Sequence, residues 1–338
     1  MATGLVRMAR ANEWWAFKFA PLLGTAYATA WVLGASSWAL LPRLLLLLLA
    51  LTVGATYVSL INDWTDRADD AASGQANRLA GKPGALVGAL LAGCLGLGLA
   101  FGYYFWQLSP QCALLYLGAW VAYSLYSLPP ARFKRRGLAG VLADAAGAHF
   151  FPQLLTAALV SAWAGRALPL GWLAAVGIWA LACGLRNILG HQLGDAAADA
   201  RSGVATFVQR RGVARARQVA VWLAFPAELL SLAALLALSH GLLPLALLLL
   251  YAGLEWFRYR VWSVPLAVAE LGPGRRLLLN EYYEVFYPLA FLLLQCRLHP
   301  ADGLVLGLHG LLFGPHIWHT GRALAQAVAV VAGKVRSR

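Results

Sequence analysis

The chain has 338 residues, of which 61% are apolar and 12% are charged, and its formal net charge is +13. A soluble domain carries about a quarter charged residues, so this composition excludes a water-soluble enzyme. Most of the basic residues lie in short loops between apolar runs. Membrane topology therefore explains the positive charge, nucleic acid is excluded as a partner, and membrane lipids are the expected surroundings.

Apolar runs of about 20 residues, the length that a helix needs to cross a bilayer, recur along the chain. They predict nine spanning helices, over residues 14–35, 41–62, 84–106, 110–127, 138–162, 168–190, 218–238, 241–259 and 283–298. Residues 303–313 are apolar but too short to span. Residues 317–334 are predicted to form an amphipathic surface helix with Arg322 and Lys334 on its polar side, with a tenth span across both pieces as the alternative. The predicted fold class is an all-α polytopic membrane protein.

Lysine and arginine favour one side of the predicted membrane. They gather in the loops after the even-numbered helices, with Arg43 and Arg166 as the main exceptions. The residues in these loops are Arg67, Arg78, Lys82, Arg132, Lys134, Arg135, Arg136, Arg201, Arg210, Arg211, Arg215, Arg217, Arg258, Arg260, Arg275 and Arg276. By the positive-inside rule, these loops and the N-terminus face the cytoplasm. We therefore expect a multi-pass protein of the cell (inner) membrane.

Two short segments hold six of the 14 acidic residues. Each follows an even-numbered helix and places polar residues four positions apart, on one helix face. In "NDWTDRADD" these are Asn62, Asp66 and Asp70, with Asp63 beside them, and in "NILGHQLGDAAADARSG" they are Asn187, His191, Asp195 and Asp199. The two helices are four apart in the chain, which predicts an internal repeat with its acidic faces opposite each other at the cytoplasmic side.

Carboxylates clustered at a membrane surface repel one another unless cations bind them. Hard oxygen ligands favour Mg²⁺, which usually takes one or two carboxylates together with phosphate oxygens of a substrate. Two facing clusters with Arg and Lys nearby would hold a diphosphate, and the apolar interior would hold a hydrocarbon tail. This chemistry points to a prenyl diphosphate. The alternative, a pair of solvated acidic loops, is disfavoured because the same spacing occurs twice in a chain poor in acids.

Three stretches resemble motifs of one family. The first acidic segment, Asn62 to Asp70, matches the pattern NDxxDxxxD, and the second, Asp195 to Thr206, is similar to DxxxDxxxGxxT. The stretch "YSLPPARFK", Tyr126 to Lys134, is similar to a loop whose tyrosine and basic residues contact the diphosphate in that family. On these motifs the chain, from about Trp14 to Pro300, resembles the UbiA superfamily of intramembrane prenyltransferases.

The resemblance implies a bundle of about nine helices around a central lipophilic cavity. It implies one domain over residues 1–300, followed by a tail over 301–338 of unassigned role. It also implies Mg²⁺ as the cofactor and transfer of a prenyl group from a prenyl diphosphate to a lipophilic acceptor, aromatic or quinone-like among others. The implied metal ligands are Asn62, Asp63, Asp66, Asp70, Asp195 and Asp199.

Residue roles follow from the motifs and from polar residues inside apolar helices. The candidate substrate-binding residues are Arg67, Arg78, Tyr126, Arg132, Lys134, Arg186, Asn187 and Lys18, and the candidate catalytic residues are Asp66, Asp195 and His191. We expect Arg186 and Asn187 to face the cavity near the diphosphate, and Lys18 either to touch phosphate or to extend to the interface. His191 is expected to bind metal, accept a proton or position a substrate, with contact to a neighbouring helix as the alternative.

Three positions depart from the family pattern. Gln192 stands where many relatives have Asp, His191 where ubiquinone-pathway relatives have Tyr, and Gln75 where relatives often have Lys. These changes leave metal binding in place but argue against the ubiquinone-pathway acceptor. Separately, Glu281 and Glu284 are expected to cap the last span rather than to line an acceptor entrance.

The expected chemical step is ionisation of the diphosphate, with metal and basic side chains stabilising the leaving group. The aromatic candidates to face the allylic cation are Tyr57, Trp64, Tyr123 and Tyr126. Two other functions stay open. A terpene cyclase on the same scaffold would use the same aspartates, and a non-catalytic lipid carrier or transporter would bind a headgroup with them. Transport is disfavoured because the polar groups gather at one membrane face rather than at midplane.

Overall fold

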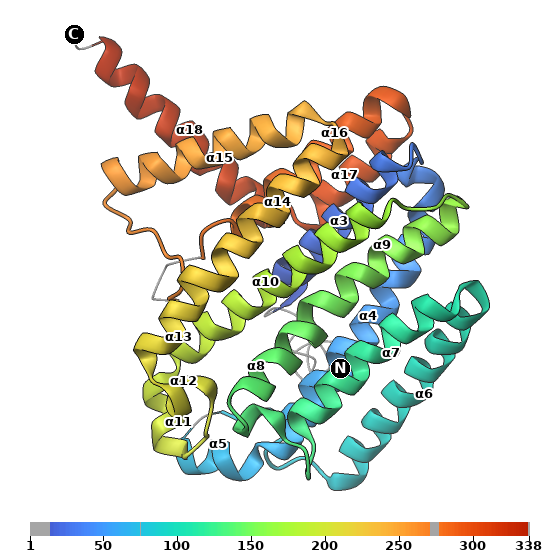
Figure 1. The fold of residues 1–338 in the computed structure, drawn as a ribbon, viewed down its shortest axis with the longest axis vertical. Coiled ribbons are helices and arrows are strands. Elements are labelled where there is room, and N and C mark those ends of the chain that lie inside the picture. Colours follow the sequence, from blue (N-terminus) through green and yellow to red (C-terminus); the bar gives the residue numbers. More distant parts are fainter. Residues whose placement is uncertain (1–13, 75, 271–276, 337–338) are drawn as a thin grey trace.

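The computed structural model describes residues 14–74, 76–270 and 277–336, and Figure 1 shows that helices build this part of the chain. With η for a π- or 3₁₀-helical turn, they are η1 (Trp15–Phe19), α3 (Ala20–Val32), α4 (Ser37–Thr65), α5 (Arg67–Ser73), α6 (Gly84–Leu108), α7 (Pro110–Ser127), η2 (Phe133–Arg135), α8 (Leu138–Ala145), η3 (Ala146–Phe150), α9 (Phe151–Ala164), α10 (Leu170–Gly194), α11 (Ala196–Ser202), α12 (Phe207–Arg211), α13 (Val213–Val219), η4 (Ala220–Ala224), α14 (Phe225–Ser239), α15 (Leu242–Val261), η5 (Tyr282–Phe286), α16 (Tyr287–Leu298), α17 (Asp302–Leu312) and α18 (Gly314–Arg336). The described ranges contain isolated bridges, such as the one between Gly137 and Thr206, but no strand. The all-α prediction is confirmed.

Six helical stretches in the described ranges are long and apolar enough to cross a membrane. They are Ser37–Thr65, Gly84–Leu108, Leu138–Ala164, Leu170–Gly194, Val213–Ser239 and Leu242–Val261. The other three predicted spans coincide with η1 and α3, with α7, and with η5 and α16. Every predicted span therefore falls on a helix, while the exact number of crossings stays a prediction.

Helix α3 is buried on all its faces. It is apolar all round, which is the pattern of a helix at the centre of a bundle. It packs against α9 and α16, and the indole of Trp172 donates a hydrogen bond to Thr29 Oγ1 at 3.1 Å. A Cβ atom at Gly24 would lie 3.1 Å from Cδ1 of Tyr287 in α16, so glycine permits this close packing.

Four helices contain a π-helical turn, and each turn comes just before a proline. The turns η1, η3, η4 and η5 end two residues before Pro21, Pro152, Pro226 and Pro288. Proline lacks an N–H group and its ring clashes with the preceding turn, so the helix widens locally to satisfy the freed carbonyls. The prolines thus redirect the side chains of the turns that precede them, a feature that hydropathy does not reveal.

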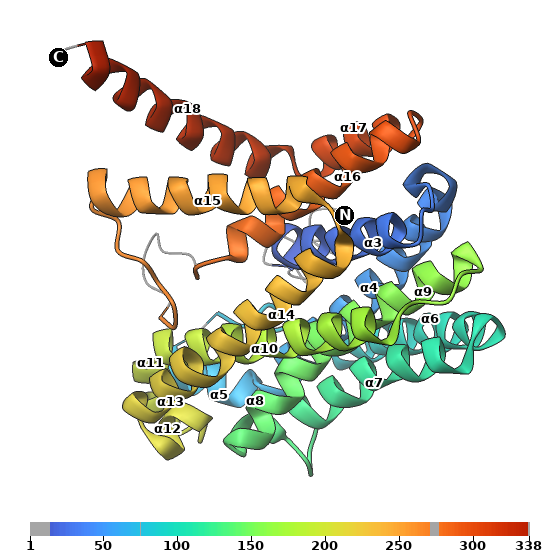
Figure 2. The ribbon, with the colours of Figure 1, turned by 45° about the horizontal axis from the view of Figure 1, so that its top comes forward.

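The C-terminal residues form two separate helices, α17 and α18, rather than one continuous helix. Asp302 at the start of α17 is fully buried, and its carboxylate accepts hydrogen bonds from Ser36 Oγ at 2.7 Å and from the backbone N–H of Trp38 at 2.7 Å. It thereby satisfies donors at the N-terminus of α4. Helix α18 begins against η5, where Thr320 Oγ1 donates to Glu281 at 2.5 Å, and then extends away from the bundle (Figures 1 and 2).

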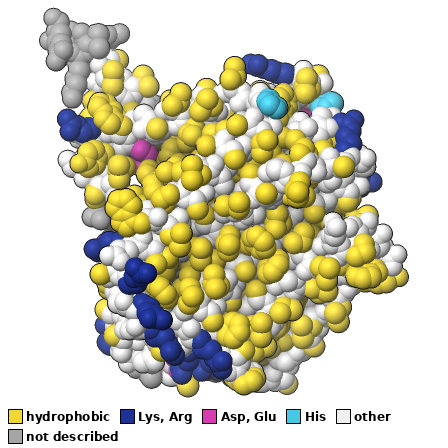
Figure 3. Space-filling model, in the orientation of Figure 1, with side chains coloured by type: hydrophobic (Ala, Val, Ile, Leu, Met, Phe, Trp, Pro, Cys, Tyr) yellow, Lys and Arg dark blue, Asp and Glu magenta, His cyan; other side chains and the backbone are white. Residues whose placement is uncertain are grey.

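Apolar side chains cover the middle of the face drawn in Figure 3. Lysine and arginine side chains form a run at its lower end, over α11 to α13. Exposed residues of these helices include Arg201, Arg210, Arg211, Arg215 and Arg217. Figure 1 places α5 at the same end. The acidic segments and this basic surface therefore share one end of the bundle.

Candidate active site

The two acidic segments have the same local structure. Helix α4 ends at Thr65, Asp66 follows, and the seven-residue helix α5 begins. Likewise α10 ends at Gly194, Asp195 follows, and the seven-residue helix α11 begins. Both short helices end at a glycine with positive φ, +70° at Gly74 and +66° at Gly203, a conformation that glycine adopts at low cost. The equal four-residue spacing in the sequence is thus reproduced as a repeated structure.

Helices α5 and α11 contact each other, and both ribbon views show them together at one end of the bundle (Figures 1 and 2). The neighbouring loops meet too, because Gly137 pairs with Thr206 in a parallel bridge. The hydroxyl of Tyr126 in α7 lies within electrostatic range of Asp66 and Asp199. The fold therefore brings the two motifs and the predicted loop tyrosine to one place.

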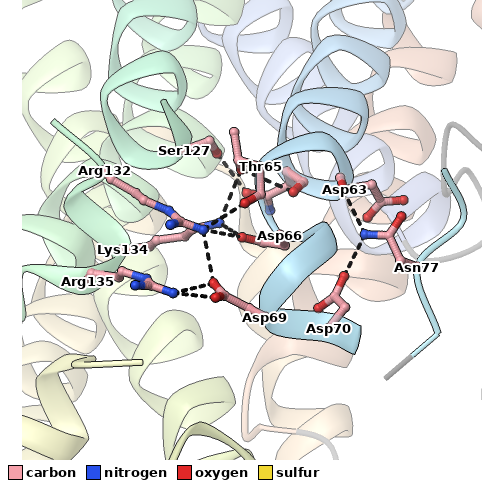
Figure 4. Close-up of polar contacts among 11 residues, drawn as sticks. Asp63, Thr65, Asp66, Asp69, Asp70, Asn77, Ser127, Arg132, Lys134 and Arg135 are labelled. Atoms are coloured by element: carbon pink, nitrogen blue, oxygen red, sulfur yellow. Dashed lines mark hydrogen bonds and ion pairs between the residues drawn. The ribbon is translucent and has the colours of Figure 1, made fainter. Parts of the chain in front are cut away.

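Three basic residues of the loop after α7 hold the first acidic segment (Figure 4). Arg132 Nη2 lies 3.2 Å from Asp66 Oδ1 and 3.0 Å from Asp69 Oδ2, and it donates to the carbonyl oxygen of Thr65 at 2.8 Å. Lys134 forms an ion pair with Asp66, and Arg135 Nη2 lies 2.5 Å from both carboxylate oxygens of Asp69.

Lys134 is nearly buried. Its burial lowers the pKa of its ammonium group, while Asp66 opposes this shift. Sequence reasoning named Arg132 and Lys134 as substrate-binding residues but gave no role to Asp69 or Arg135, because nothing in the spacing of the chain shows that this loop folds back onto α5.

Asparagine side chains hold the remaining groups of the first segment. Asn62 Oδ1 accepts a hydrogen bond from Ser127 Oγ at 2.7 Å. Asn77 donates to Asp70 Oδ2 at 2.7 Å and to the backbone oxygen of Asp63 at 2.7 Å (Figure 4). The side chain of Asp63 is buried, with 1% of its surface exposed. All four predicted metal ligands of this segment therefore lie at the same end of α4 and in α5.

The second segment is less enclosed. Asp195 is exposed, and Asp199 is partly buried. Burial and the neighbouring Asp195 raise the pKa of the Asp199 carboxyl, while a hydrogen bond from Thr206 opposes the shift. Gln192, the departure from the family, is 6% exposed, and its Oε1 accepts the backbone N–H of Phe207 at 3.1 Å. This hydrogen bond holds the start of α12 in place. An uncharged amide is sufficient for that role.

The carboxylates are the type of ligand that a divalent metal such as Mg²⁺ prefers, because Mg²⁺ binds hard oxygen ligands. Within the described residues, however, no three His, Cys, Asp or Glu side chains are already gathered as a metal site requires. The contacts in Figure 4 give the physical reason: Asp66 is directed to Arg132 and Lys134. Metal binding by these residues requires that the basic side chains take another anionic partner.

Arg67 contacts the loop between α5 and α6. Its guanidinium donates to the carbonyl oxygen of Leu79 at 2.7 Å and sits 4.3 Å from the ring centroid of Trp64. Arg78 lies, partly buried, in the loop between α5 and α6. Gln75 falls outside the described residues. The loop between α5 and α6, which carries Arg78, is thus held against Arg67 at the start of α5.

Arg186 does not face the cavity as we expected. It is fully buried in an ion pair with Glu228 of α14, with 2.6 Å between Nε and Oε2. The capping expected of Glu281 is also wrong, because its carboxylate binds Arg258 and Thr320. Glu284 lies within η5 and lines a cavity. Glu281 thus faces α15 and α18, which carry Arg258 and Thr320.

Two cavities lie in the bundle beside η1. The first, of about 150 Å³, is apolar and is lined by Tyr123, Trp120 and Leu155 among others. The second, of about 320 Å³, is lined by polar residues that include Asn187 and His191. Lys18 lines both cavities. Of the aromatic candidates, Tyr123 faces the first cavity, whereas Trp64 stacks with Arg67.

Sequence reasoning missed several residues of the second cavity, among them His149 and Gln153. The sequence feature that could have identified them is the presence of polar residues close to Pro152 inside an otherwise apolar predicted span.

The UbiA prenyltransferase family profile matches residues 20–268, about three quarters of the chain. The chain belongs to the UbiA prenyltransferase family. A comparison with curated proteins finds no match. Among solved structures, a UbiA homolog from Archaeoglobus fulgidus bound to GPP and Mg²⁺ is similar, with 16% identity, a TM-score of 0.54, and coverage of 90% of this chain and 99% of that one.

Two further structures of a UbiA homolog from the same organism have the same fold. One is bound to DMAPP and Mg²⁺, with 15% identity, a TM-score of 0.52, and coverage of 95% of this chain and 99% of that chain. The other is bound to Cd²⁺, with 15% identity, a TM-score of 0.51, and coverage of 97% and 99%. The likeness confirms the UbiA fold that the motifs indicated.

Proposed function

We propose that this UbiA-family chain catalyses Mg²⁺-dependent transfer of a prenyl group from a prenyl diphosphate to a lipophilic acceptor. The observation that carries this proposal is the contact between α5 and α11, which brings two acidic segments of the same structure to one end of an apolar bundle. The fold shared with UbiA homologs bound to GPP or DMAPP and Mg²⁺ supports a prenyl diphosphate as donor.

The proposed metal ligands are those of the two segments. They are Asn62, Asp63, Asp66, Asp70, Asp195 and Asp199. When bound there, Mg²⁺ would neutralise the negative charge of the diphosphate and so favour its departure. Asp66 and Asp195 hold equivalent positions in the two segments, directly before α5 and α11. For this reason we expect their loss to have the largest effect on diphosphate release.

Arg132 and Lys134 are proposed to exchange partners when the donor arrives. Both now contact Asp66, and a diphosphate carries more negative charge than one carboxylate. Their transfer to phosphate oxygens would place two cations at the leaving group, where charge develops as the C–O bond breaks. Asp66 would then be released from both ion pairs. Tyr126, within electrostatic range of Asp66, is proposed to contact the same group.

The apolar cavity is the proposed site of the prenyl chain. Its lining by Trp120 and Tyr123 offers aromatic faces to an allylic cation, and its apolar walls exclude water that would capture the cation. The exposed basic surface over α11 to α13 supports an orientation in the cell (inner) membrane with the site opening to the cytoplasmic side.

The test is Mg²⁺-dependent release of diphosphate by the purified protein in lipid nanodiscs. The donors are geranyl, farnesyl and geranylgeranyl diphosphate, each supplied with and without a membrane-lipid extract as the source of acceptor. The loss-of-function variant is Asp66→Ala with Asp195→Ala. The matched control is Glu270→Ala, which removes an exposed carboxylate that pairs with Arg217 outside the site.

The expected result is release that rises with the extract, stops when EDTA removes the metal, and is lost in the double variant but not in the control. Release that does not change with the extract would instead point to cyclisation or hydrolysis of the donor. No release from any donor, with donor binding retained, would overturn the enzyme proposal in favour of a lipid carrier.

A further inference from the structure

A third cavity lies between α15 and α18. Its volume is about 620 Å³, and it is lined by α15, the loop that follows α15, the residue before η5, and α18. Among the described residues it shares Leu277 alone with the second cavity and none with the first. Helix α18 begins well beyond residue 268, where the match to the family profile ends. One wall of this cavity therefore belongs to the part of the chain to which no role has been assigned.

Each of the two helices turns one polar face toward this cavity. On α15 the lining residues Tyr251, Glu255 and Arg258 are four and three positions apart, which places them on one helix face. On α18 the lining residues His319 and Arg322 are three positions apart and share a face in the same way. The helices contact each other, and their C-terminal ends diverge (Figures 1 and 2). The cavity is the space between these two faces.

The α15 side of the cavity is acidic. Arg258 Nη1 lies 2.5 Å from Glu255 Oε1 and also pairs with Glu281. Two carboxylates thus surround one guanidinium, and Glu255 has only this shared partner among the described residues. The side chain of Glu255 is partly exposed and lines the cavity. This side is suited to a ligand that brings positive charge and N–H donors.

The α18 side of the cavity is basic. Arg322 is exposed and forms no ion pair or hydrogen bond with another residue of the described ranges, and His319 beside it is exposed as well. Residues 303–338 contain no Asp or Glu. A guanidinium with free N–H groups is suited to bind phosphate oxygens. The cavity therefore offers a carboxylate on one wall and a cation on the opposite wall.

The surroundings of the cavity place it at the level of lipid headgroups. Trp262 and Trp318 line it, and the side chain of Trp318 is 69% exposed, as is common for tryptophan at a membrane interface. The last turn of α15 carries two arginines, which assigns this end of the span to the cytoplasmic interface. Beyond the cavity, α18 exposes Val328 and Val331 as it extends away from the bundle (Figure 2). Phospholipids are the amphiphiles available at this level.

We propose that this cavity binds the headgroup of a zwitterionic phospholipid with a primary ammonium group, as in phosphatidylethanolamine. The phosphate oxygens bind Arg322 and His319, and the ammonium group donates to Glu255. Phosphatidylglycerol lacks the cation that Glu255 would bind, and the quaternary ammonium of phosphatidylcholine has no N–H group to donate. The bound lipid joins α15 to α18 and so holds the C-terminal helix against the bundle. The inference goes beyond the proposed function and does not depend on prenyl transfer.

The first test measures lipid binding to the full chain by native mass spectrometry. The protein is stripped of lipid in detergent and titrated with phosphatidylethanolamine, phosphatidylcholine or phosphatidylglycerol of identical acyl chains. We expect the ethanolamine lipid to bind roughly tenfold more tightly than either of the others, the effect of one charge-assisted contact. Arg322→Gln and Glu255→Gln are each expected to remove most of this preference. The matched controls are Arg260→Gln and Glu270→Gln, because neither residue lines the cavity.

Three outcomes of this titration would overturn the proposal. Equal affinity for the three lipids would show only the general lipid shell of a membrane protein. Tighter binding of phosphatidylglycerol would show a simple cationic surface. A preference that persists in Arg322→Gln and Glu255→Gln would place the site elsewhere.

The second test needs no substitution in the cavity. Hydrogen exchange of the wild-type chain is compared in nanodiscs of phosphatidylcholine with and without phosphatidylethanolamine. We expect the ethanolamine lipid to slow exchange in residues 314–326 by at least about threefold and to leave residues 84–108 of α6 unchanged. Equal exchange in residues 314–326 would refute the site. Asp66→Ala with Asp195→Ala is expected to keep the lipid preference, and its loss in that variant would refute the placement between α15 and α18.

Discussion

Arg186 in α10 and Glu228 in α14 form a two-point ion pair in which both side chains are fully buried, with Nε–Oε2 at 2.6 Å and Nη2–Oε1 at 2.7 Å. The hydroxyl of Tyr283 donates to the same carboxylate at 3.0 Å. Arg186 also donates to the carbonyl oxygen of Leu278 at 2.7 Å. The pair joins α10, α14 and, through Tyr283, η5. An arginine that hydropathy analysis marks as functional therefore stabilises the packing of the bundle.

We expect Arg186→Met to lower the free energy of unfolding by roughly 3–5 kcal/mol, because the substitution leaves the Glu228 charge buried without compensation. Thermal unfolding in nanodiscs measures the loss. The double variant Arg186→Met with Glu228→Leu removes both charges and is expected to recover most of the stability. A stable Arg186→Met protein with weakened donor binding would show instead that Arg186 contacts the diphosphate.

Asp66 and Asp69 provide a comparison within one ion-pair cluster, since both bind Arg132. Asp66→Asn is expected to lower the rate of diphosphate release by at least about 100-fold, on the scale of losing one preorganised electrostatic contact. Asp69→Asn is expected to change it by less than about threefold, because partly exposed ion pairs contribute up to about 1 kcal/mol. Rates are measured at saturating donor and Mg²⁺. Equal losses in the two variants would place Asp69 in the metal site as well.

Substitutions at Gln192 test whether this departure from the family motif has a structural role. Gln192→Leu removes the acceptor for the backbone N–H groups of Phe207 and Val208, and we expect it to destabilise the start of α12 by about 1–3 kcal/mol. Faster hydrogen exchange in residues 205–212 is the readout. Gln192→Glu keeps an acceptor oxygen and is the control that should preserve protection. If Gln192→Leu exchanges at the wild-type rate, the contact is not the reason for this residue.

Substitutions at Asp302 test whether the tail, residues 301–338, folds as part of the helical bundle. Asp302→Ala removes the hydrogen bonds that cap α4, and the expected destabilisation is about 0.5–2 kcal/mol. Thermal unfolding measures it, with Asp302→Asn as the variant that keeps an acceptor and most of the stability. A melting temperature of Asp302→Ala equal to that of the wild-type chain would support a domain that ends at residue 300 and a tail that folds independently.

The sequence by itself predicted the helices, their order and the two acidic segments at the charged end of the bundle. Helix length and apolar composition are local properties, and so is a four-residue spacing that keeps Asp66 and Asp70 on one face. The glycines that end α5 and α11 are part of the same local pattern. The family followed from these motifs alone.

Only the tertiary structure decided which partner each charge has. Arg186 and Glu228 are 42 positions apart, and Lys18 and His149 are 131 apart. No local pattern relates such pairs, because they meet only after the helices have packed and the π-helical turns have set the direction of their side chains. A charge enclosed by apolar helices requires a partner, and the packing of the helices makes that partner Glu228 for Arg186 and His149 for Lys18.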